Sequence, residues 1–155
     1  MKTKNCKNQN YYLFINSDGY GSDEKIVSAY EIAKYRIKHK IYPLFNRTLH
    51  IKELKDNDGF IFYVAGKKQN CKHFISYGKV ESIEDKNKYN EEQLDIYKPF
   101  HKFAKLKSIK PIYNKNIIDL KKKLTFIPHT NKWGYVLQGG VIKISKLDFE
   151  TIIKE

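Results

Sequence analysis

The sequence contains few of the residues that build cross-linked or metal-binding proteins. Its 155 residues include only two cysteines, Cys6 and Cys71, which are too few for a disulfide framework or a paired set of zinc ligands. The segment from Cys71 to His73 could supply two metal ligands, but no second Cys/His pair completes a site. We therefore predict free thiols, no bound metal and no cofactor.

Long apolar runs are also missing. No stretch of about twenty apolar residues is present, which excludes a transmembrane helix, and the N-terminal segment MKTKNCKNQN lacks the apolar centre of a signal peptide. We expect a cytoplasmic protein without a membrane partner. We also expect a frayed N-terminus over residues 1–10 and a single domain over residues 11–155, because the 41% hydrophobic content suffices for one core.

Acidic residues are outnumbered by basic ones, 17 against 30, which leaves a net charge of +13. An excess of this size favours an anionic partner such as nucleic acid. Only Arg36 and Arg47 are arginines, whereas lysine, asparagine, isoleucine and tyrosine are abundant, as in proteins from A/T-rich genomes. Part of the charge can reflect codon composition, so the charge supports nucleic-acid binding without establishing it.

Sequence motifs for catalysis are absent. The chain has no phosphate-binding glycine loop, no G-x-S-x-G and no H-E-x-x-H. His39, His50 and His101 could meet carboxylates in three dimensions, but an isolated histidine is usually structural or solvent-exposed. We therefore expect a binding protein and not an enzyme.

Three apolar runs are predicted to form β-strands, which favour branched and aromatic residues. Residues 11–16, YYLFIN, and residues 60–66, FIFYVAG, are too short for helices and have the composition of buried strands. Residues 73–83, HFISYGKVESI, are predicted to pair antiparallel with the second run. Gly78 within them indicates a bulge or a sharp bend.

Capping residues mark the predicted helices. Ser22, followed by two acidic residues, is predicted to start a helix over residues 23–38, whose apolar residues recur at spacings of four, three and four. Ser145, three positions before Asp148, is predicted to start a closing helix. Residues 116–124, NIIDLKKKL, are predicted to form a short helix.

The remaining segments complete the predicted fold class. Residues 100–112 are predicted to form a strand that ends at Pro111, because proline has no amide hydrogen to donate to a sheet. The polar, weakly periodic residues 84–98 are predicted to form a long loop. Strands outnumber helices without regular alternation, which indicates an α+β fold with helices packed on a mixed or antiparallel sheet.

Several stretches, in this order, resemble the EVE domain of the PUA-like superfamily, whose relatives include the YTH readers of methylated adenine. The stretches are YYLFINS, RTLHIKELKDNDGFIFYVAG, YGKVESI and IIDLKKKLTFIPHTNKW, which runs into GGVIKISKLDFETII. The last one matches the family's lysine-rich L-x-F-I-x-x-x-x-x-W, followed by a small-residue turn and a final helix. The resemblance covers about residues 11–153. It implies a pseudo-barrel of mixed, mainly antiparallel strands with flanking helices, and a pocket that holds one flipped-out base.

The resemblance suggests residues for that pocket. Relatives carry a tryptophan after the first helix, where this sequence has Tyr42, and polar groups after the first strand, where it has Asn16, Ser17 and Asp18. Tyr97 is the best candidate for a second wall. Aromatic walls are suitable because stacking contributes about 1–3 kcal/mol per base. For each residue the alternative is a structural role as a core aromatic or a turn residue.

Later residues complete the predicted site. Trp133 could stack on a base, and its alternative place is the core. In the stretch HKIYPLFNR, Ile41 and Phe45 are predicted to face inward, whereas Tyr42 is predicted to lie on the pocket rim with the cations. Cations near the predicted rim could neutralise phosphates, and they are Lys40, Arg47, Lys67, Lys68 and Lys132.

These observations predict a nucleic-acid-binding module that reads a methylated or similarly modified base in an aromatic pocket. The first alternative is an RNA-binding PUA-like module that attaches by charge and shape and ignores modification. The second alternative is a nuclease or hydrolase like some relatives of the ASCH group, since the fold does not forbid catalysis. The sequence leaves open which base is read, and whether the partner is DNA or RNA.

Overall fold

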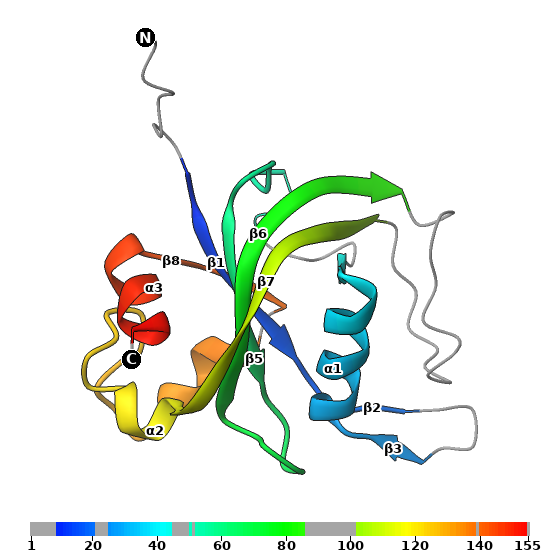
Figure 1. Cartoon of the computed structure of the whole chain (residues 1–155). Helices are drawn as coiled ribbons and strands as arrows, with labels where there is room; N and C mark the ends of the chain where they lie inside the picture. Colours follow the sequence, from blue (N-terminus) through cyan, green and yellow to red (C-terminus); the bar gives the residue numbers. More distant parts are fainter. Residues whose placement is uncertain are drawn as a thin grey trace, which may run out of the picture.

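The computed structural model describes residues 9–20, 25–44, 50, 52–85, 102–138 and 140–154. Six strands form one sheet in the order β4-β7-β6-β5-β1-β8, and β2 pairs with β3. Figure 1 shows a curved sheet with α1 on one side and α2 and α3 on the other. The elements are β1 (Tyr11–Asn16), β2 (Gly19–Tyr20), β3 (Ile26–Val27), α1 (Ala29–His39), β4 (Ile41–Leu44), β5 (Gly59–Val64), β6 (His73–Asp85), β7 (Lys102–Asn116), α2 (Ile117–Leu120), η3 (Trp133–Gln138), β8 (Val141–Ile144) and α3 (Lys146–Ile153).

Strands β1 and β5 lie parallel at the centre of the sheet. Every residue of β5 is buried, and so is every residue of β1 after Tyr11. Both faces of these strands are covered, which explains why their sequences are continuous apolar runs without polar alternation. The other neighbouring strands of the sheet pair antiparallel. The structure confirms the predicted central strands and the predicted α+β fold with a mixed, mainly antiparallel sheet.

Alternating side chains of the central strands build two separate cores, one on each face of the sheet. On one face, Phe14 and Phe62 belong to a cluster that includes Ala33 of α1. On the other face, Leu13 belongs to a cluster that includes Ile152 of α3. The position of a residue in this alternation therefore decides which side of the molecule it joins.

The long strands β6 and β7 curl together across the sheet (Figure 1). Their register shifts at three places, one of them around Gly78. A Cβ on Gly78 would lie 2.8 Å from the backbone oxygen of Lys107, so a glycine is needed for the close approach of β7. The extra residue lies on β7 near Ser108, which has a positive φ of 54°. The predicted irregularity at Gly78 is confirmed, with the bulge on the partner strand.

Helix α1 begins later than predicted. Its N-cap is Ser28, whose side chain accepts a hydrogen bond from the amide of Glu31 at 3.2 Å. The two residues before Ser28 form β3, which pairs antiparallel with β2. The predicted helix start is wrong because this pairing keeps Ile26 and Val27 extended, whereas the predicted cap Ser22 lies outside the described residues. Ser28 and Glu31 also have the spacing of a capping box.

Strand β7 continues past Pro111, so the predicted strand end at that residue is wrong. Pro111 is aligned with Ser76 beside a register shift, and proline is tolerated at such an irregularity.

The two later predicted helices are confirmed as α2 and α3, with Asn116 and Ser145 as their N-caps. Residues 84 and 85 of the predicted loop belong to β6, and the rest lies outside the described residues. None of the helices that the structure describes is long and apolar enough to cross a membrane.

Candidate nucleic-acid interface

The predicted polar residues lie where β1 ends, beside the N-terminus of α1 and the turn after β5. Asp18 links these segments, since its Oδ1 accepts a hydrogen bond from the Ala29 amide at 2.8 Å and its Oδ2 accepts one from the Lys67 amide at 3.3 Å. Gly66, with a φ of +83°, passes so close that a Cβ there would lie 2.5 Å from Asp18 Oδ1. Asp18 therefore has the structural role given as its alternative, whereas Ser17 beside it is exposed.

Replacing Asp18 with alanine should lower the free energy of unfolding by about 1–2 kcal/mol, because an amide at the start of α1 loses its acceptor. Asp18→Asn keeps an Oδ1 acceptor for the Ala29 amide and should cost less than half as much. Urea denaturation of both variants measures the difference. Equal losses for the two variants would mean that the carboxylate charge matters more than the hydrogen bond.

Asn16 is fully buried at the end of β1. Its Nδ2 donates to the carbonyl oxygens of Phe14 and Tyr63, each at 3.2 Å, and its Oδ1 accepts a hydrogen bond from Nη1 of Arg36 at 3.0 Å. Buried polar groups need such partners. The predicted place of Asn16 in the wall of an open pocket is wrong because its amide is bonded inside the protein and holds a buried guanidinium.

Arg36 is a residue that the sequence reasoning missed. Its side chain is only 7% exposed, and its guanidinium carbon lies 5.4 Å from the ring centroid of Tyr42. Arg36 follows the buried Ile32 and Ala33 by four and three positions, which places it on the apolar face of α1. The sequence pattern could have pointed to Arg36, since an arginine on an apolar helix face indicates a buried charge, and a buried charge requires specific partners.

Tyr42 belongs to the core and not to a pocket rim. Its side chain is 2% exposed, and its ring stacks on Phe14 with centroids 4.4 Å apart and planes 18° apart. The hydroxyl lies 2.5 Å from the carbonyl oxygen of Ile15 and 2.7 Å from that of Gly140. The predicted rim position is wrong because the pairing of β4 with β7 turns Tyr42 into the α1-side core. The inward position predicted for Ile41 is confirmed.

Trp133 lies on the opposite side of the sheet from Tyr42. It is half-buried in η3 and packs against the core cluster on the α3 side. The ammonium of Lys121 lies 5.1 Å from a ring centroid of Trp133, a cation–π distance. Tyr42 and Trp133 therefore do not form two walls of one pocket, and Trp133 occupies the core-edge position given as its alternative.

Four of the lysines predicted to bind phosphate lie in the described part of the chain. They are exposed, but they do not form one patch. Lys67 and Lys68 lie in the turn after β5, next to the start of α1. Lys40 caps the other end of α1, and a helix of 11 residues is about 16 Å long. Lys132 precedes Trp133 on the far side of the sheet. The predictions for Phe45, Arg47 and Tyr97 lie outside the described residues.

Two buried titratable groups lie near the start of β1. Burial, reinforced by the charge of Asp58, raises the pKa of Tyr12 to about 12, so its hydroxyl stays protonated at neutral pH. Burial also raises the pKa of Asp58, against the effect of the Asn10 and Lys55 amides, which donate to its carboxyl oxygens at 3.1 and 3.0 Å. Asp58 therefore ties the turn before β5 to the start of β1.

Within the described residues no group of three or more His, Cys, Asp or Glu side chains could hold a metal ion.

Solved structures provide the comparison that decides the fold. Human THYN1 protein, solved in complex with DNA that contains 5-methylcytosine, superimposes with a TM-score of 0.58 over 93% of this chain and 95% of that chain, at 11% sequence identity. Protein Atu2648 from Agrobacterium tumefaciens superimposes with a TM-score of 0.51 over 94% and 91%, at 12% identity. The protein has an EVE/PUA-like fold.

The EVE/PUA-like fold confirms the resemblance found in the sequence. No protein-family model matches this chain, and no curated protein matches it significantly. At 11% and 12% identity the structural likeness establishes the fold and leaves function to be argued from the site. In this EVE/PUA-like fold, the junction of β1, the turn after β5 and the start of α1 presents Ser17, Lys67 and Lys68 to solvent.

Proposed function

We propose that this protein binds nucleic acid and distinguishes a methylated or similarly modified base from its plain counterpart, acting by binding and not by catalysis. The observation that carries the proposal is the likeness, over 93% of the chain, to a protein solved on DNA that contains 5-methylcytosine. The net charge of +13 favours the same class of anionic partner.

In the proposed mode of binding, the modified base leaves its stack and enters a pocket, at a cost of about a few kcal/mol. A methyl group adds only about 0.8 kcal/mol of apolar transfer, so the pocket must also fit the base closely. We assign the base edge to Ser17 and backbone phosphates to Lys67 and Lys68, which are exposed at one junction of the fold. Tyr97 remains the proposed stacking wall, because Tyr42 is in the core.

Competition between oligonucleotides tests the proposal. The purified protein is titrated with labelled DNA and RNA strands, and unlabelled competitors carry 5-methylcytosine, 5-hydroxymethylcytosine, N6-methyladenine or the plain base. We expect one modified strand to compete about fourfold better than its plain counterpart, the ratio that corresponds to about 0.8 kcal/mol for one buried methyl group. Absolute affinities should fall as salt rises because phosphate contacts release counterions.

Each other outcome has a defined meaning. Equal competition by modified and plain strands would remove the reader function and leave the alternative of a general RNA- or DNA-binding module. No binding of any strand at low salt would remove nucleic-acid binding altogether. Steady turnover of a labelled strand, abolished by a single His or Asp substitution, would show that the protein is an enzyme like some ASCH relatives.

A further inference from the structure

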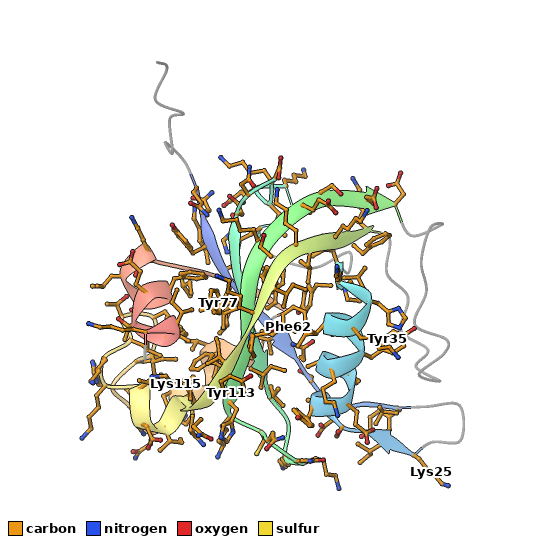
Figure 2. The ribbon with its side chains drawn as sticks, viewed as in Figure 1. Lys25, Tyr35, Phe62, Tyr77, Tyr113 and Lys115 are labelled. Carbon is orange, nitrogen blue, oxygen red and sulfur yellow. The ribbon has the colours of Figure 1, made fainter. Side chains whose placement is uncertain are left out.

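A cleft of about 450 Å³ opens on the α3 side of the sheet, away from the junction described above. Figure 2 shows Tyr77 on this side of β6, and Tyr35 far from it on α1. Small-molecule and nucleotide sites usually have volumes of about 300–1,000 Å³, so the cleft is large enough for one nucleotide. Its lining residues are Gln9, Tyr11, Gly59, Tyr77, Gly78, Lys79, Ser108, Lys110 and Phe149.

The register of the sheet creates this cleft. Tyr11 of β1 is aligned with Gly59 of β5, and Gly59 is aligned with Lys79 of β6. Because Gly59 has no side chain, the rings of Tyr11 and Phe149 pack directly over it at the edge of the cleft. A Cβ on Gly59 would lie 2.6 Å from Cδ1 of Tyr11 and 3.3 Å from the ring of Phe149. A side chain at this position would push these two rings out of the wall of the cleft.

Three aromatic rings from separate elements form one wall. The rings of Tyr11 and Phe149 lie with centroids 4.7 Å apart and planes 45° apart. Tyr77 meets Phe149 edge-on, with centroids 6.2 Å apart and planes 83° apart. Tyr11 and Tyr77 are partly exposed, so their rings are available to a flat partner. Such surfaces accept any nucleobase, because every base has a π-face.

The cations of the cleft stand next to these rings. Lys110 of β7 is aligned with Tyr77 of β6, and Lys79 follows Tyr77 by two positions, so all three side chains leave the same face of the sheet. Both lysines are exposed, and no acidic side chain among the described residues pairs with either. By contrast, Lys107 on the same strand is bonded to Asp56 at 3.0 Å. None of the described residues that line the cleft is acidic.

We infer that this cleft is a second nucleic-acid contact, which takes one unpaired nucleotide with its base against Tyr11, Tyr77 and Phe149 and its phosphate between Lys79 and Lys110. The inference rests on the proposed nucleic-acid binding but not on the reading of a modified base. Rings beside exposed cations fit a planar anionic ligand, whereas a cationic ligand would meet repulsion from both lysines.

Binding of fluorescein-labelled dT10 and U10, followed by anisotropy at low salt, tests this inference. Lys79→Glu/Lys110→Glu should weaken binding at least tenfold, because two phosphate contacts become repulsive. Lys122→Glu/Lys123→Glu is the matched control, since these exposed lysines follow α2, do not line the cleft and give the same change in net charge. The control should weaken binding less than threefold.

Tyr77→Leu separates stacking from charge and should weaken binding about fivefold, since the apolar bulk is kept but the π-face is lost. Thermal melting identifies any variant that fails to fold, in which case the lysine pair and its control decide. Equal losses of affinity for the two lysine-pair variants would overturn the inference. So would a competition experiment in which polyglutamate displaces the labelled strand equally well from the wild type and from Tyr77→Leu. The preference for a modified strand should not change in the cleft variants, so a failure here leaves the proposed function intact.

Discussion

Replacing Tyr42 with alanine should lower the free energy of unfolding by about 3–5 kcal/mol, the usual cost of removing a large buried aromatic side chain. The ring is 2% exposed and stacks on Phe14 at 4.4 Å, so its removal leaves a cavity in the α1-side core. The variant also removes the hydroxyl beside the carbonyl oxygens of Ile15 and Gly140. Urea denaturation followed by circular dichroism measures the loss.

Tyr42→Phe is the matched control for that experiment. It keeps the stacked ring and removes only the hydroxyl, so its expected cost is about 1 kcal/mol. A Tyr42→Ala variant that kept wild-type stability but lost the preference for a modified strand would contradict the core position. Such a result would return Tyr42 to the rim of a base pocket.

Replacing Asn16 with leucine should lower the free energy of unfolding by about 2–4 kcal/mol, because a buried charged donor loses an acceptor. The Asn16 side chain is 0% exposed, and its Oδ1 lies 3.0 Å from Nη1 of Arg36. Leucine branches at the same carbon but is larger, so the loss combines the missing polar contacts with some crowding in the core. The measurement is again urea denaturation.

A double-mutant cycle with Arg36→Met isolates this contact. If Asn16 and Arg36 stabilise each other, the double variant should be more stable than the sum of the two single losses predicts, by at least about 1 kcal/mol. Additive losses would mean that the two side chains act independently, and that Asn16 serves only the carbonyl oxygens of Phe14 and Tyr63.

The buried pair also bears on the proposed function. Asn16 and Arg36 lie directly beneath the junction where Ser17 is exposed, so they connect the end of β1 to α1. A pocket that discriminates by one methyl group needs walls held in place by such contacts, because a loose wall loses a difference of about 0.8 kcal/mol. We therefore expect Asn16→Leu to reduce the preference for a modified strand more than it reduces overall affinity.

Much of the fold could be predicted because its signals are local. Apolar runs of six or seven residues indicated β1 and β5, and the Ser145 to Asp148 spacing indicated the cap of α3, whose hydroxyl accepts a hydrogen bond from the Asp148 amide at 3.0 Å. The start of α1 was predicted incorrectly because two signals competed. The pairing of β2 with β3 selected Ser28 over Ser22, and this pairing joins residues that local capping rules do not compare.

The sequence by itself determined the charge, the central strands, the N-cap of α3 and, through the resemblance, the EVE/PUA-like fold. Only the tertiary structure decided that Tyr42 and Asn16 are buried, that Trp133 lies across the sheet from Tyr42, and that Tyr11 and Tyr77 border one cleft. The physical reason is that burial and proximity depend on strand register and helix docking between distant segments. The residue type alone does not distinguish a tyrosine in a core from a tyrosine in the wall of a nucleotide-binding site.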